Sequence, residues 1–132
     1  MTGADVKNNI MNNDLDNSLD NDIINHEQFE DMRDLFEEDF AELIQTYITD
    51  SQQRIVTLRA TQAADDNANG FEAAHALKGA SANIGATQLV ALSDQLQEYC
   101  RERKINQQAA LIENISLALQ HAEQEINKRM SY

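Results

Sequence analysis

The sequence predicts an all-α protein, an antiparallel up-down four-helix bundle with a short additional N-terminal helix. Its 132 residues include no proline and only four glycines, too few turn residues for a β-sandwich or barrel of this length. From His26 onward, apolar residues recur at the i, i+3, i+4 and i+7 spacing of amphipathic helices. The breaks between these apolar runs are short, so neighbouring helices are expected to pack antiparallel.

The chain divides near residue 25 into two parts of different composition. Residues 1–25 hold seven Asn and five Asp and show no sustained apolar period, which indicates an acidic, flexible tail. Residues 26–132 carry the helical periodicity and are long enough for one domain with its own core. We therefore expect a tail over 1–25 and a helical bundle over 26–132.

The first two helices are predicted from their apolar stripes. A short helix is expected over 26–36, with Phe29, Met32 and Phe36 on one side. A longer helix of roughly 25 residues follows, because the helical spacing continues without a break. Its inward stripe is Phe40, Leu43, Ile44, Tyr47, Ile48, Ser51, Ile55 and Leu58.

The remaining three helices are bounded by turn and capping residues. The stretch 65–70 breaks the pattern and offers N-caps for a third helix, which should run to Ile84 with Gly85 at its C-terminal cap. A fourth helix should end in the cations of 101–104, and Asn106 is expected to cap a fifth. The expected inward residues are Leu89, Leu92, Leu96 and Tyr99 in the fourth helix, and Ile112, Ile115, Leu119, Ala122, Ile126 and Met130 in the fifth.

The charge distribution excludes several classes of function. The net charge is −13, made up of −4 over residues 1–25, −8 over 26–66 and −1 over 67–132. So negative a chain is not expected to bind nucleic acid or an anionic membrane surface. There is no apolar run of transmembrane length and no signal-peptide pattern, and the single cysteine suits a reducing compartment. We expect a cytoplasmic monomer.

The third predicted helix places a histidine opposite its core-facing stripe. At 100° per residue the inward positions of this helix cluster together, whereas His75 and Gly79 lie almost opposite them. An exposed imidazole is largely neutral near pH 7, which is the state that a nitrogen nucleophile requires. The inward set is Ala73, Ala74, Leu77, Ala80, Ser81 and Ile84.

The residues around His75 suit a reactive side chain that another protein must approach. Gly79 costs about 1 kcal/mol relative to alanine in a helix interior, and an outward position gives it no packing role. Lys78 lies three residues after His75, so its ammonium can reach a group carried by the imidazole. Phe71 lies one turn before His75, as an apolar anchor beside the same face.

The run from Ala74 to Gly85, AHALKGASANIG, resembles the signature of histidine-containing phosphotransfer (HPt) domains. In that signature, H-x-L-K-G precedes small residues and a glycine that ends the helix. The layout of one long helix before the motif and two helices after it is also similar. By this resemblance His75 is the phosphorylated residue, at Nε2, Lys78 steadies the phosphoryl group and Gly79 gives steric access.

The resemblance further implies the partners and the source of the catalytic metal. The phosphoryl group would come from an aspartate in the receiver domain of a hybrid sensor kinase and pass to, or return from, an aspartate in a response regulator. The receiver would supply Mg²⁺, so this chain would bind no cofactor or metal and would act as a phosphocarrier rather than an enzyme. The expected docking residues are Ala68, Phe71, Glu72, Ala82 and Asn83.

Three other classes of protein also place a histidine on a helix or share the helical fold. A sensor kinase would need an acidic residue after the histidine and room for an ATP-binding domain. A di-iron bundle would need two Glu-x-x-His steps, but only Glu72 with His75 forms one, since Ala118 precedes His121 at that spacing. A non-catalytic helical adaptor that binds receiver domains without phosphotransfer remains the alternative.

Overall fold

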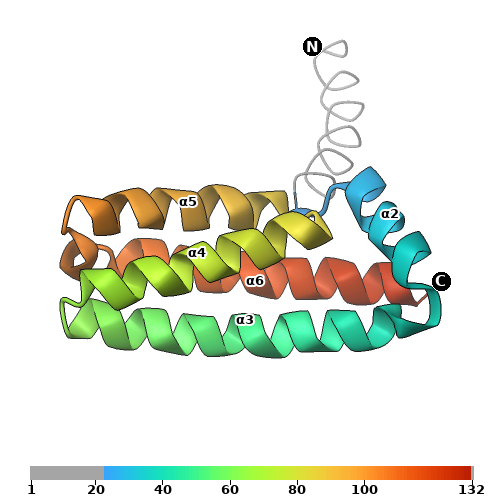
Figure 1. Ribbon diagram of the computed structural model, residues 1–132, viewed down its shortest axis with the longest axis horizontal. Helices are drawn as coiled ribbons and strands as arrows, with labels where there is room; N and C mark the ends of the chain where they lie inside the picture. Colours follow the sequence, from blue (N-terminus) through green and yellow to red (C-terminus); the bar gives the residue numbers. More distant parts are fainter. Residues whose placement is uncertain (1–22, 132) are drawn as a thin grey trace, which may run out of the picture.

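The computed structural model describes residues 23–131, and in this range every regular element is a helix (Figure 1). The all-helical fold class is therefore confirmed. None of the helices described is long and apolar enough to cross a membrane. The elements are α2 (His26–Phe36), η1 (Glu37–Asp39), α3 (Phe40–Ala63), α4 (Asn67–Ile84), α5 (Thr87–Arg101), η2 (Ile105–Gln107) and α6 (Ala109–Met130).

The four long helices lie side by side, and the chain reverses direction between each one and the next (Figure 1). Helix α4 packs most extensively against α5 and also contacts α3, while α6 closes the arrangement by contacting both α3 and α5. Helix α2 lies at one end and contacts α3 and α4. This places α4, the helix that carries His75, between two neighbours that cover one of its faces.

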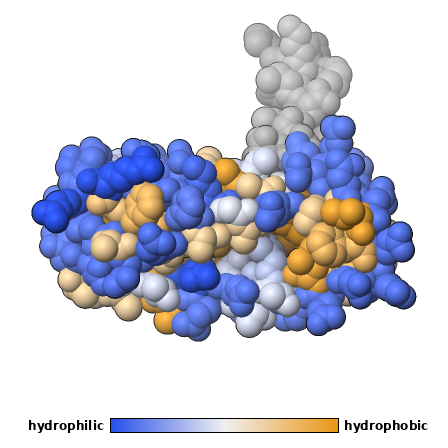
Figure 2. Space-filling model, in the orientation of Figure 1, coloured by the Kyte–Doolittle hydropathy of each residue, from blue (hydrophilic) through white to orange (hydrophobic). Residues whose placement is uncertain are grey.

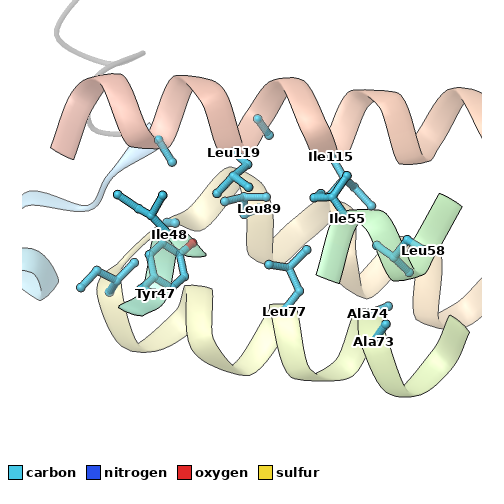
Figure 3. Packing of buried hydrophobic residues seen from close by; sticks show 14 of the residues in the cluster. Tyr47, Ile48, Ile55, Leu58, Ala73, Ala74, Leu77, Leu89, Ile115 and Leu119 are labelled. Carbon is cyan, nitrogen blue, oxygen red and sulfur yellow. The ribbon is translucent and has the colours of Figure 1, made fainter. Parts of the chain in front are cut away.

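Apolar side chains from all four long helices meet in a common core, part of which is drawn in Figure 3. The predicted stripe of α3 is buried throughout, except that Leu43 is only half-buried. In α6 the predicted residues are also buried, apart from the half-buried Met130 at the helix end. Because burial of such side chains is the main driving force for folding, the inward stripes of α3 and α6 help to hold the bundle together.

The inward face of α5 differs from the expected one. Leu89 and Leu96 are buried as expected, but Leu92 and Tyr99 are only half-buried. Two polar residues, Ser93 and Gln97, occupy the buried positions between the leucines. Periodicity in apolar residues alone could not find this face, because its centre is polar.

The start of α6 was also predicted wrongly. Asn106 does not cap this helix: it lies in η2, and α6 begins at Ala109 after Gln108, which makes no side-chain cap hydrogen bond. The fully buried side chain of Ile105 holds the connection against the bundle, and the Ile105 N–H donates to Asn67 Oδ1 at 3.0 Å. Burial of this one residue therefore moves the start of the helix two positions along the chain, from the expected cap at Asn106 to Gln108.

The expected tail lies outside the described residues from position 1 to 22. The three remaining positions already belong to the fold: Ile24 is fully buried and Asn25 caps α2 by accepting a hydrogen bond from the Gln28 N–H at 2.9 Å. The Asn25 N–H in turn donates to the carbonyl oxygen of Gly85 at 2.7 Å. We expected the folded part to begin at His26, but these contacts show that it begins before that residue.

Candidate functional site

Helix α4 is fixed at both ends by the residues that the sequence suggested. Asp66 is its N-cap and accepts a hydrogen bond from the Asn69 N–H at 3.1 Å. Gly85 ends the helix with φ of 85°, a left-handed conformation that L side chains rarely adopt. A Cβ at this position would also lie 3.1 Å from the Asn25 carbonyl oxygen, so glycine is needed for both reasons.

The buried face of α4 turns His75 toward solvent. Leu77 projects into the core between the neighbouring helices (Figure 3), with the other expected inward residues except Ala80, which is exposed. Ser81 is fully buried and its hydroxyl is hydrogen-bonded to Tyr47 Oη of α3 at 2.8 Å. Because these contacts fix the rotation of α4, His75 is an exposed residue in the middle of the helix.

An aromatic ring lies beside the His75 imidazole, nearly parallel to it. Phe71 lies one turn earlier, with its ring almost parallel to the imidazole, 7° between planes and 5.9 Å between centroids. The guanidinium of Arg101, from the end of α5, lies 5.2 Å from the centroid of the Phe71 ring. Phe71 is thus a neighbour of the imidazole as well as a candidate docking residue.

Lys78, which the helix spacing places within reach of a group carried by His75, is paired with a residue of the neighbouring helix. Its Nζ forms an ion pair with Asp94 Oδ1 of α5 at a distance of 2.8 Å. Sequence reasoning missed Asp94 because the pairing crosses two helices. The signal that could have predicted this ion pair is the antiparallel packing of α4 against α5, which places Asp94 opposite Lys78.

Gly79 is exposed and surrounded by open space. A Cβ built at this position would meet no atom within 4 Å, apart from its own helix backbone and chain neighbours. The absence of a side chain is therefore not required by packing inside this chain. It leaves the helix surface one turn after His75 bare, which allows a close approach from outside.

The five expected docking residues fall into two groups on either side of the histidine. Ala68, Phe71 and Glu72 line a shallow groove between the start of α4 and the end of α5, which also includes Arg101. Ala82 and Asn83 lie near the other end of α4, where both are exposed. The structure therefore does not bring the five into one continuous pocket but spreads them along the outer face of α4.

An apolar groove near the second group was not anticipated. Phe36, predicted to lie on the same side of α2 as Phe29 and Met32, is 37% exposed, and its neighbour Leu35 is 73% exposed. Figure 2 shows hydrophobic surface gathered toward the α2 end of the molecule. The groove between α2, α3 and α4 is lined by Met32, Phe36, Leu43, Thr46, Tyr47, Asp50, Ala80, Asn83 and Ile84.

Neither of the other two histidines has the surroundings of His75. The Nδ1 atom of His26 lies 3.0 Å from a guanidinium nitrogen of Arg129, and His121 is half-buried on α6. Over residues 23–131 no three His, Cys, Asp or Glu side chains come together in a group that could hold a metal ion. An exposed imidazole beside a lysine and a bare glycine is thus the most distinctive chemistry of the described chain.

Comparisons with known proteins agree with this geometry. The structure of histidine-containing phosphotransfer protein B (HptB) from Pseudomonas aeruginosa PAO1 is similar, with a TM-score of 0.77, 25% identity and coverage of 83% of this chain and 96% of that one. The maize histidine-containing phosphotransfer protein ZmHP2 shares the fold, with a TM-score of 0.74, 19% identity and coverage of 89% and 96%. No curated protein matches the sequence significantly.

The sequence profile of the Hpt domain matches residues 42–125. This range includes the whole of α4 and α5, most of α3 and the first part of α6. The match spans more than half of the 132 residues, and the chain therefore belongs to the Hpt domain family.

Proposed function

We propose that this protein is a phosphorelay intermediate that carries a phosphoryl group on His75. The single observation that carries the proposal is the exposed imidazole on the outer face of α4, within a domain of the Hpt family. The bare surface at Gly79 supports it, because a partner must bring an aspartyl phosphate to within bonding distance of the imidazole.

In the proposed reaction, the neutral His75 imidazole attacks the phosphorus of an aspartyl phosphate through Nε2. The P–N bond forms as the P–O bond to the aspartate breaks, and the aspartate leaves as a carboxylate. The other imidazole nitrogen keeps its proton, and the reverse reaction returns the group to a second receiver. Lys78 supplies a positive charge on the same helix face for the transferred group.

We assign the remaining catalytic groups to the partner. Phosphoryl transfer needs neutralisation of charge on the phosphoryl oxygens, which Mg²⁺ in an acidic pocket provides. Around His75 this chain supplies Glu72, Lys78 and an aromatic ring, a set unsuited to holding Mg²⁺ by itself. The proposed partners are the receiver domain of a hybrid sensor kinase and that of a response regulator, and this chain acts as a monomeric phosphocarrier.

In this proposal the bundle is the rigid support, and residues 26–132, together with Ile24 and Asn25 that pack against them, form the functional domain. The antiparallel up-down arrangement of α3 to α6, with α2 as the short additional helix, keeps α4 from rotating during transfer. Ala68, Phe71 and Glu72 on one side of His75, and Ala82 and Asn83 on the other, would contact the receiver. Their spread along α4 suits a partner surface that is broader than a single pocket.

A transfer assay tests the proposal directly. A receiver domain phosphorylated on its aspartate is mixed with this protein in the presence of Mg²⁺, and acid-labile, base-stable phosphate on this chain is measured. Label is expected on the wild type and on the matched control His121→Gln, and none on His75→Gln. Receivers that bind the protein tightly but never transfer label would instead establish the non-catalytic adaptor.

A further inference from the structure

The ion pair between Lys78 and Asp94 joins the candidate site to a neighbouring helix. Lys78 follows His75 by three residues on α4, so the two side chains are neighbours on the helix surface. Asp94 comes from α5, and its Oδ1 lies 2.8 Å from Lys78 Nζ. Since α4 and α5 form the most extensive helix pair of the bundle, the backbone of Asp94 is held at a fixed place beside the site.

We propose that Asp94 is a positioning residue that holds the Lys78 ammonium before phosphorylation and competes for it with the phosphoryl group on His75. The proposal rests on the function proposed above, because it concerns a phosphoryl group on this imidazole. Asp94 itself touches no reacting atom in this proposal. It acts only through Lys78, by setting how strongly the ammonium is available to the phosphoryl oxygens.

Exposure of the pair makes this exchange feasible. The side chains of Lys78 and Asp94 are 37% and 51% exposed, and ion pairs in such surroundings are weak. A phosphoryl group carries roughly −1.5 to −2 charges and three acceptor oxygens, so it attracts an ammonium more strongly than one carboxylate does. Phosphorylation of His75 should therefore draw Lys78 away from Asp94, or lead the ammonium to bridge the two anions.

Competition between Asp94 and the phosphoryl group for Lys78 affects how readily the group leaves His75. A carrier must give up its phosphoryl group as readily as it accepts it, so an ammonium that bound the group without competition would retain it. By opposing Lys78, Asp94 weakens the hold on the phosphoryl group, by up to about fivefold for a pair of this strength. Asp94 would thus keep the group transferable.

Other carboxylates near the site do not share this contact. Glu98, one turn after Asp94, is paired with Arg101. Glu72, one turn before His75 on α4, is exposed and serves as a matched control for a charge on the same surface. Comparing Asp94→Asn with Glu72→Gln therefore separates release of Lys78 from a general loss of negative charge.

The test measures the second ionisation of the phosphoryl group on His75 by ³¹P NMR. Phosphoramidate phosphorylates the full-length protein without any partner: a P–N bond to His75 forms, the P–N bond of the reagent breaks and ammonia leaves. The resonance missing from His75→Gln identifies the site. Because an ammonium stabilises the doubly charged form, Asp94→Asn should lower the ionisation midpoint by up to about 0.7 pH unit, a fivefold effect.

A double-mutant cycle decides whether Lys78 carries this effect. Lys78→Ala should raise the midpoint, and adding Asp94→Asn to Lys78→Ala should produce no further change beyond that of Glu72→Gln. An equal shift with and without Lys78, or no shift in Asp94→Asn, would overturn the proposal. Since no receiver is used, the expected pattern can be obtained even if the transfer assay fails, so the two proposals are tested separately.

Discussion

Two glycines of α4 show how a single residue can serve either packing or access. Gly70 is buried, and an added Cβ would overlap Ile105 Cδ1 and lie 3.3 Å from Thr61 Oγ1. At Gly79, in the same helix, an added Cβ would meet nothing within 4 Å. Because alanine is the better helix former, a glycine kept where alanine would fit points to a role outside the folded chain.

The substitution Gly79→Ala is expected to separate stability from transfer. It should raise the free energy of unfolding by about 1 kcal/mol, because the helix gains a better former without a clash. The added methyl group should weaken the contact with the receiver by about 1.4 kcal/mol. Phosphoryl transfer from the receiver should therefore fall by roughly tenfold. Urea unfolding and the rate of label transfer measure the two quantities.

The matched variant Gly70→Ala should behave in the opposite way. The new methyl group forces Ile105, which is fully buried, to move within a packed interior. We expect a loss of about 1 to 3 kcal/mol in the free energy of unfolding, with transfer by the folded fraction unchanged. If Gly79→Ala also destabilised the protein, the bare surface at Gly79 would have to be explained by folding instead.

At the scale of elements, the ends of α4 determine where its outer face points. Asp66 accepts hydrogen bonds from both the backbone and the side chain of Asn69, at 3.1 and 2.7 Å. The side-chain bond, followed by the backbone bond, lowers the pKa of Asp66. A carboxylate whose pKa is lower in the folded state stabilises it above its unfolded pKa, and this contribution disappears as the pH falls through the folded pKa.

Replacing this cap should therefore have a pH-dependent cost. Asp66→Ala is expected to lower the melting temperature by several degrees at pH 7, because two hydrogen bonds at the helix start are lost. The difference from wild type should narrow as the pH falls through the lowered pKa of Asp66, because the side chain then becomes protonated. Asp66→Asn keeps a side-chain acceptor and should stay close to wild type at pH 7. An equal loss in both variants would mean that charge, and not capping, is what matters here.

The helices of this protein differ in how far their sequences predict them. The start and end of α4 follow from Asp66 and Gly85, and its outward histidine follows from the apolar face opposite. The inward face of α5 could not be found in the same way, because Ser93 and Gln97 are polar. The prediction that Asn106 caps α6 was wrong for a related reason, since burial of Ile105 depends on tertiary contacts that no local pattern encodes.

The candidate site likewise has features that the sequence predicts and contacts that it does not predict. The positions of His75, Lys78 and Gly79 relative to one another follow from helix geometry, which is local. The contacts that cross between helices, from Asp94 to Lys78 and from Arg101 to Phe71, depend on the register of α4 against α5. Sequence periodicity fixes which face of a helix is buried but not how far one helix slides along another, so these partners emerged only from the structure.

At the scale of the whole molecule, one buried polar contact ties α3 to the helix that carries the site. Tyr47 Oη and Ser81 Oγ are joined by a hydrogen bond of 2.8 Å inside the core. Burial raises the pKa of Tyr47 to about 12, although hydrogen bonds with Ser81 and Ser51 oppose the increase. Because an ionised tyrosine is so poorly accommodated there, the stability of the bundle should depend on the protonated form of this phenol.

This dependence predicts a loss of stability in alkali with a defined cause. The folded pKa of about 12 lies above the unfolded value of 10, so the contribution is complete below pH 10 and is lost as the pH rises through 12. The free energy of unfolding should fall by about 2 kcal/mol between pH 9 and pH 11.5 through this group alone. Urea unfolding followed by far-UV circular dichroism at a series of pH values measures the profile.

The variant Tyr47→Phe isolates this contribution from every other group that titrates in alkali. At pH 8 it should be less stable by about 1 kcal/mol, because the fully buried Ser81 hydroxyl loses its partner. Its profile above pH 10 should be flatter than that of the wild type, so the two proteins should reach equal stability at about pH 10.7, and the variant should be the more stable one at about pH 11.5. Parallel profiles would show that Tyr47 reaches solvent before it ionises. The α3–α4 contact that fixes the rotation of His75 would then open locally, ahead of the rest of the bundle.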